Sequence, residues 1–238
     1  ILFDFYISGV VSDIHEYPGE YEVWNDIFSS EIDATVAIYG SSRAWVHIDP
    51  AIILASTGLR AYNFGVDGQN FMIQYLRHRK YLKYNKPPEK IIFSLDVFSL
   101  AKARDLYNKN QFLPYMLCDR EIFRYTHKYS GFKLADYYIP LIRYGGNFSV
   151  FESLIKGDKT IVRQDGFRGM EREWTDDLKN AESLYSNFKI DIDSSLIELF
   201  EKFIIEIKER NIQMVFVYTP ELKEGQGFVK NRDEIFYI

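Results

Sequence analysis

Serine and glycine residues follow the first two predicted strands of this sequence in an order that suits acyl transfer. Residues 40–43 read GSSR and come directly after the apolar run ATVAIY. A serine on the turn from a strand to a helix can expose its hydroxyl as a nucleophile, close to helix amides that stabilise developing negative charge. Ser42 is therefore a candidate nucleophile. A serine that only caps the turn is the alternative interpretation.

The second group of residues, 63–70, reads NFGVDGQN and follows the predicted strand RAYNF. Gly65 and Gly68 allow a sharp turn and a close approach of the backbone to a ligand, although plain turn glycines would look the same. A third run, IIFSLDV at residues 91–97, contains Asp96 and is followed closely by Ser99. In an open α/β sheet, ligands bind beyond the carboxyl ends of the strands, so these three segments are expected to meet.

The elements that position these residues follow from apolar patterning. Strands are predicted at about 34–39, 60–64, 91–97 and 212–220, and helices at about 49–58, 69–84 and 193–210. Asp49 before Pro50 is typical of a helix start, and Gly58 of a helix end. Strands separated by connections of helix length indicate βαβ units, whose right-handed crossovers give a parallel sheet covered on both faces. The predicted class is α/β.

The domain organisation predicted is an N-terminal arm at 1–33 and a single α/β domain at 34–238, with an insertion at about 101–190. Long insertions often serve as lids or binding surfaces. This one is rich in aromatic residues, for which core packing is the favoured interpretation and stacking on sugars the alternative. The aromatic residues concerned are Tyr125, Tyr129, Phe132, Tyr137, Tyr138 and Tyr144.

Taken together, GSSR, NFGVDG and SLDVFS resemble the SGNH (GDSL-like) hydrolase family, over about residues 34–100 and 193–220. The similarity is greatest to its bacterial extracytoplasmic branch, which is associated with acylation of cell-surface polysaccharides and cell walls. The resemblance implies a three-layer α/β/α sandwich and ester hydrolysis or acyl transfer through an acyl-serine at Ser42. It also implies an oxyanion hole made by the amides of Ser42 and Gly68, with Asn70 as a further donor.

The sequence departs from the family pattern in its third motif and in its base. The family has GxND where this chain reads LDVFSL, so Asp96 and Ser99 are the nearest counterparts of the missing asparagine. The family's base is a histidine three residues after an aspartate near the C-terminus. None of the four histidines here lies beyond the fourth predicted strand, and they are His15, His47, His78 and His127. A serine hydroxyl without a base is a poor nucleophile.

Three interpretations of the missing base remain open. The sequence ends before the full domain does, which we favour, or one of the four histidines serves as the base, or the domain is non-catalytic. His47 lies five residues after Ser42 but is interpreted as a partly exposed residue near a helix start, and His78, within RHRK, as part of a solvated helix face. His127 is interpreted as a member of an aromatic cluster. Arg43 is expected to hold the turn through a salt bridge rather than to orient substrate.

Composition narrows the function further. The chain has 29 basic and 34 acidic residues, a net charge of -5, and no basic run, so nucleic acid is not an expected partner. The single cysteine, Cys118, excludes a disulfide framework and is interpreted as a buried or unreactive thiol. No cofactor or metal is predicted, since the spacing of Asp119, Glu121 and His127 fits no common site.

The apolar start, ILFDFYISGVV, is consistent with the end of a signal or of a membrane anchor upstream of Ile1. A strand or extended arm is the alternative. The partner expected from the resemblance is an acylated carbohydrate or another ester outside the cytoplasm.

Overall fold

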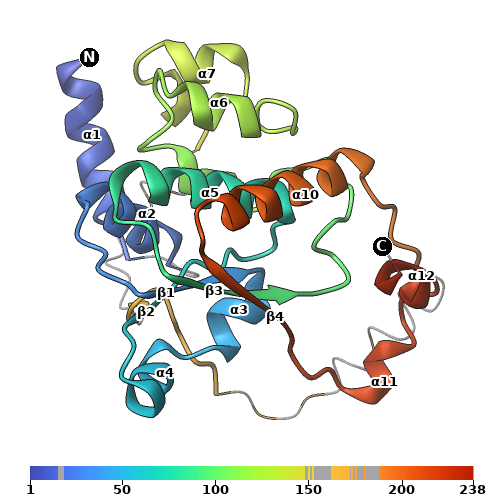
Figure 1. Ribbon diagram of the computed structural model, residues 1–238. Coiled ribbons are helices and arrows are strands. Elements are labelled where there is room, and N and C mark those ends of the chain that lie inside the picture. The colour runs from blue at the N-terminus through green and yellow to red at the C-terminus, as the bar shows by residue number, and fades with distance from the viewer. Residues whose placement is uncertain are drawn as a thin grey trace.

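A parallel sheet of four strands, in the order β2-β1-β3-β4, lies at the centre of the protein (Figure 1). The strands are β1 (Val36–Gly40), β2 (Ala61–Asn63), β3 (Lys90–Leu95) and β4 (Gln213–Tyr218). A computed structural model describes residues 1–15, 19–147, 162–171 and 188–237, with the single residues Val150, Glu152, Glu173, Thr175 and Asn180. Within those residues, none of the helices combines the length and apolar character needed to cross a bilayer.

The register of the sheet brings the ends of its central strands to one edge. Val36 of β1 lies opposite both Ala61 and Lys90, and β3 pairs with β4 from Lys90 to Leu95. All four strands are parallel, so the segments that follow Gly40, Asn63 and Leu95 leave the sheet at the same edge. The central strands are apolar because helices cover both of their faces.

Helices on the two faces complete the three layers. On one face lie α5 (Phe71–Tyr84) and α10 (Ser194–Glu209), where Phe71 and Phe203 pack against Phe93 of β3. On the other face lie the short α3 (Ser42–His47) and α4 (Pro50–Thr57), over Val36 and Ile38. The result is a three-layer α/β/α sandwich, which confirms the predicted fold class.

The predicted ends of α4 and α10 are confirmed because their signals are local. The Asp49 carboxylate accepts from the Ala51 amide at 2.8 Å, and Gly58 ends α4 with φ 73°. Asp193 caps α10 in the same way, through the Ser195 amide at 2.9 Å. An acidic cap before the first turn satisfies amides that have no partner within the helix.

The first residues form helices, and the strand or extended arm considered for them is wrong. They fold into α1 (Leu2–Ser12) and α2 (Glu20–Ser29), and α2 buries Trp24 and Ile27 in the main core. The buried side of α1 carries Asp4, which accepts hydrogen bonds from the Arg143 guanidinium at 2.8 and 2.6 Å. The partner of Asp4 is therefore far away in the sequence, where local patterning cannot reveal it.

The described part of the expected insertion is built from short helices. These are η1 (Lys109–Phe112), α6 (Arg120–Thr126), α7 (Leu134–Tyr138) and η2 (Ile142–Tyr144). Outside the insertion, the short helices α11 (Lys223–Gln226) and α12 (Arg232–Phe236) follow β4. The predicted core packing is confirmed for four of the aromatic residues, since Tyr125, Tyr129, Tyr137 and Tyr144 are buried, whereas Tyr138 is exposed. Cys118 is exposed and not buried. Most of residues 148–187 lie outside the described residues.

His78 lies in the core, so its interpretation as part of a solvated face is wrong. Its Nδ1 atom is 2.9 Å from the Tyr39 hydroxyl, and the edge of its ring contacts Phe203. Burial, aided by the charges of Arg210 and Arg79, lowers the pKa of His78 to about 3. The imidazole is therefore neutral in the folded protein at physiological pH.

The buried His78 makes stability depend on pH. An unfolded histidine has a pKa of about 6.5, so below that pH His78 is protonated in the unfolded chain but stays unprotonated in the folded protein. The free energy of unfolding should therefore decrease as the pH is lowered below about 6.5. The variant His78→Gln should lack this pH dependence. Between pH 7.5 and 5, we expect the wild type to lose about 2 kcal/mol more than the variant in urea titrations. Parallel curves for the two proteins would contradict the assignment.

Candidate functional site

A pocket of about 400 Å³ opens at the carboxyl edge of the sheet, where the segments after β1, β2 and β3 meet. Ser42, Arg43, Gly68, Asn70 and Asp96 all line it, so the structure brings these five predicted residues together, and Ser99 is not in its described lining. The rest of the described lining is made by Ser41, Gln69, Phe98, residues 101–103, Phe188, Ile190 and Asp191. The three motif segments therefore meet as predicted, and together they line a pocket.

The end of β1 sets the position of the two serines. Gly40 has φ 147°, and a Cβ there would lie 2.7 Å from the Ser94 carbonyl oxygen of β3. Ser41 then caps α3, because its hydroxyl accepts from the Arg43 amide at 3.4 Å and donates to the Asp96 carboxylate. Ser41 is thus the residue that caps α3. The alternative interpretation of Ser42 as the capping serine is wrong.

Ser42 is the first residue of α3 and is only partly buried. Its hydroxyl makes no hydrogen bond to any described residue, and it lines the pocket. The backbone amides of the first turn of a helix lack partners within the helix, and they carry the positive end of its dipole. Ser42 therefore combines a free hydroxyl with a favourable position for stabilising an anion.

Gly68 holds the other predicted oxyanion amide. It has φ 63°, and the Tyr107 ring packs so closely that a Cβ would lie 2.4 Å from it. Both the positive φ and the contact with the Tyr107 ring therefore exclude a side chain at position 68. Among the described residues, neither the Gly68 amide nor that of Ser42 donates to an acceptor. Both amides are available to a ligand in the pocket.

Asn70 has structural partners that occupy its side chain. Its Oδ1 atom caps α5 by accepting from the Met72 amide at 3.2 Å, and its Nδ2 atom donates to the Ala101 carbonyl at 2.9 Å. The Tyr129 hydroxyl also donates to it, at 3.2 Å. Asn70 therefore fixes the start of α5 and the segment after β3 against each other.

Asp96 and Ser99 stabilise a turn after β3. Asp96 accepts from the Phe98 amide at 2.8 Å as well as from the Ser41 hydroxyl, and its own amide donates to the Ser99 hydroxyl at 3.0 Å. A carboxylate accepts hydrogen bonds and repels an oxyanion. Asp96 is thus positioned to orient Ser41 and the β1–α3 turn. The sequence motifs did not indicate this hydrogen bond between Ser41 and Asp96.

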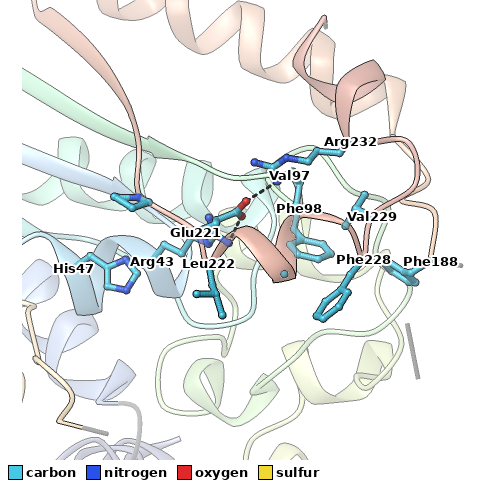
Figure 2. Close-up of a pocket in the computed structure, with 12 residues that line it drawn as sticks. Arg43, His47, Val97, Phe98, Phe188, Glu221, Leu222, Phe228, Val229 and Arg232 are labelled. Atoms are coloured by element: carbon cyan, nitrogen blue, oxygen red, sulfur yellow. Dashed lines mark ion pairs between the residues drawn. The ribbon is translucent and has the colours of Figure 1, made fainter. Parts of the chain in front are cut away.

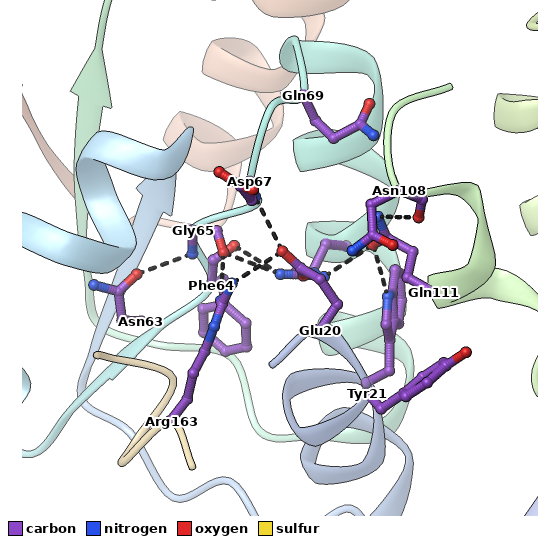
Figure 3. A network of polar contacts seen from close by, with 12 residues as sticks. Glu20, Tyr21, Asn63, Phe64, Gly65, Asp67, Gln69, Asn108, Gln111 and Arg163 are labelled. Carbon is purple, nitrogen blue, oxygen red and sulfur yellow. Dashed lines mark hydrogen bonds and ion pairs between the residues drawn. The ribbon is translucent and has the colours of Figure 1, made fainter. Parts of the chain in front are cut away.

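A buried ionic network supports the loop before Gly68 (Figure 3). Glu20 of α2 pairs with the guanidinium groups of Arg77 and Arg163, and it also accepts from the Asp67 amide at 3.0 Å. Both arginines donate to the Gly65 carbonyl, at 3.1 and 2.9 Å. Burial opposes ionisation of Glu20, but the two arginines outweigh it and lower the pKa of its carboxyl. No local sequence pattern indicates this network, because its members are far apart in the chain.

Arg43 forms the predicted salt bridge, with Glu221 as its partner. Glu221 follows β4 and also pairs with Arg232 of α12 at 2.6 Å (Figure 2). Burial raises the pKa of Glu221, but Tyr218 and the two arginines outweigh that effect and lower it. This ion triad joins α3 to the C-terminal helices beside Ser42.

The triad borders a second pocket, of about 690 Å³, which adjoins the first (Figure 2). Arg43, Phe98 and Phe188 line both pockets. The remaining lining is mainly apolar and includes Val97, Leu222, Phe228 and Val229. A polar pocket that contains the candidate nucleophile thus continues into an apolar one.

The four histidines all lie outside the Ser42 pocket. His47 lines the adjoining pocket, where partial desolvation of its ring and the charge of Arg43 lower its pKa. His15 is 2.8 Å from Glu22 near the N-terminus, and His127 stacks on Phe123. None of them contacts Ser42 among the interactions of the described residues.

Searches of family models, curated proteins and solved structures found no match to this chain.

Proposed function

We propose that this protein is an SGNH-type serine esterase or acyltransferase, acting on acyl groups of a carbohydrate or cell-surface polymer. The observation that carries the proposal is Ser42, a serine with a free hydroxyl at the start of a helix, in a pocket at the carboxyl edge of a parallel sheet. Because the neighbouring Ser41 performs the capping, the helix does not require a serine at position 42.

In the proposed reaction, the Ser42 oxygen bonds to the acyl carbonyl carbon while its proton passes to a base. The carbonyl oxygen takes the electron pair, and the amides of Ser42 and Gly68 hold the resulting oxyanion. Collapse of the intermediate expels the alcohol, which leaves with a proton, and the acyl group remains on Ser42. Water or a sugar hydroxyl then accepts it. The family resemblance implies a histidine as this base, and the described lining of the Ser42 pocket contains no histidine.

The two adjoining pockets support a substrate with an apolar and a polar part. The larger pocket offers Val97, Leu222 and Phe228 to an acyl chain, and the smaller one offers the polar side chains of Gln69 and Lys102 to a sugar. Ligand pockets of this kind combine an apolar lining with a few polar groups that fix orientation. An extracytoplasmic location accompanies this proposal, through the family resemblance.

The alternative is a non-catalytic SGNH-like module that binds carbohydrate or assembles with an acylation partner. It is favoured by one observation, the absence of a histidine from the described lining of the Ser42 pocket. In that case the pocket would bind a glycan without transferring an acyl group, and Ser42 would lack the activation that a nucleophile needs.

A serine-directed fluorophosphonate probe separates the two functions. An activated serine attacks the phosphorus and expels fluoride, so the enzyme should carry a covalent adduct on Ser42, located by peptide mass spectrometry. Ser42→Ala should abolish labelling, and Ser29→Ala, at an exposed serine outside the pocket, should not. An unlabelled but folded protein that binds glycans would favour the non-catalytic module.

A further inference from the structure

One end of the molecule exposes a group of large apolar side chains from two distant parts of the sequence. They are Leu2, Phe3 and Phe5 of α1 together with Leu134, Ile139 and Ile142 in and around α7 and η2, and we call them the apolar end. In Figure 1, the N-terminal end of α1 and the segment around α7 stand on the same side of the molecule. Contiguous apolar patches of this kind are rare on monomers and mark interaction surfaces.

Hydrogen bonds fix the two parts of the apolar end beside each other. The buried Asp4 carboxylate, between Phe3 and Phe5, accepts from the Leu141 amide at 2.6 Å and pairs with Arg143. Leu141 lies between the exposed residues Ile139 and Ile142 in sequence. The inward face of α1 thus holds its only charged residue, while its outward face is apolar.

A basic rim accompanies the apolar end. Within residues 120–142, which the structure describes throughout, the exposed Lys and Arg side chains are Arg120, Arg124, Lys128 and Lys133, and no Asp or Glu there is exposed. Helix α6, which carries Arg120 and Arg124, lies beside α7, because the rings of Phe123 and Tyr138 are 5.7 Å apart.

Of the partly buried acidic residues beside the rim, Asp136 accepts from the Lys133 amide at 2.6 Å, and the other two pair with cations. Asp119 binds Lys80, and Glu121 binds Arg79. The rim is therefore positive on a chain whose net charge is -5.

We propose that the apolar end docks on the surface of an anionic lipid bilayer. Exposed Phe and Leu side chains enter the boundary between headgroups and acyl chains, where burying them removes apolar surface from water. The basic rim meets the anionic headgroups, and each Lys or Arg near such a surface contributes attraction that salt weakens. Apolar side chains next to exposed cations are the combination that a lipid surface of this charge recognises.

The test is flotation of the full 238-residue chain with vesicles of phosphatidylglycerol and phosphatidylcholine, at equal parts, and with phosphatidylcholine alone. We expect binding to the anionic vesicles that weakens with added salt. Phe5→Asp and Leu134→Asp should each weaken it by about tenfold or more, because each loses the burial of a large apolar side chain. Lys128→Glu should weaken binding to anionic vesicles only.

Ile52→Asp is the matched control, since Ile52 of α4, Phe5 and Leu134 are each 65% exposed and Ile52 lies outside the apolar end. It should bind as the wild type does, and circular dichroism should show all variants folded. Equal loss for Ile52→Asp, or no binding to either vesicle, would overturn the proposal. So would self-association that Phe5→Asp abolishes while vesicle binding is absent, because the apolar end would then contact a second copy.

Discussion

Ser42→Ala is expected to lower the rate of p-nitrophenyl acetate hydrolysis by about 10³-fold or more, to a rate near background. The reason is that the variant retains the pocket and the amides of residue 42 and Gly68 but loses the oxygen that forms the acyl-enzyme. The residual rate would report what the oxyanion amides contribute without a nucleophile. Release of nitrophenol, followed by absorbance, measures both proteins.

His47→Ala is the informative control for that experiment. His47 lies five residues from Ser42 in sequence but lines the adjoining pocket and has no contact with the serine. Its removal should change the rate by less than about twofold, which is small beside the effect of a lost acid–base group. If Ser42→Ala hydrolyses the ester as fast as the wild type does, the serine mechanism is wrong. A large loss in His47→Ala would instead make His47 the base.

Glu20→Ala is expected to lower the free energy of unfolding by about 3–5 kcal/mol, because removing one partner of a buried ionic group leaves uncompensated charge inside the protein. Both Arg77 and Arg163 would lose the carboxylate that neutralises them, and the Asp67 amide would lose its acceptor. Urea denaturation followed by tryptophan fluorescence measures the difference. Glu31→Ala, at an exposed site just after α2, should change stability by less than about 0.5 kcal/mol.

The same Glu20 variant also tests the connection to the site. The arginines of the network hold the Gly65 carbonyl, three residues before Gly68, so loosening them should displace the oxyanion amide. We therefore expect ester hydrolysis by Glu20→Ala to fall even at temperatures where the protein is still folded. Stability equal to that of the wild type would show that the charges of the arginines are neutralised in another way.

The elements predicted correctly from the sequence are those whose signals lie within a few residues. Asp49 and Gly58 bound α4, and Asp193 starts α10, because caps act on the adjacent turn. The four apolar runs predicted the strands. The central strand β1 is buried throughout, as expected in a parallel sheet, whereas β4 is apolar although it lies largely exposed at the edge of the sheet. The helix at α1 could not be predicted, because its buried face is defined by the pairing of Asp4 with Arg143.

The error at His78 has the same origin. The run RHRK looks solvated because of its charges, yet Arg77 and Lys80 are buried beside carboxylates of other elements, Glu20 and Asp119. At the site, the meeting of Ser42 with Gly68 followed from the rule for parallel sheets. The contact of Ser41 with Asp96 did not, because it depends on side-chain geometry that only the folded β1–α3 turn defines.

The ion pairs of α1 and α2 have a consequence for the order of events during synthesis. Asp4 pairs with Arg143, and Glu20 pairs with Arg77 and Arg163, so Asp4 lacks its partner, and Glu20 one of its two partners, until the chain has been synthesised as far as these arginines. Such long-range contacts close late, since the entropy of a large loop must be lost first. The packing of α1 and α2 is thus expected to be completed only after residues 143 and 163 have been synthesised.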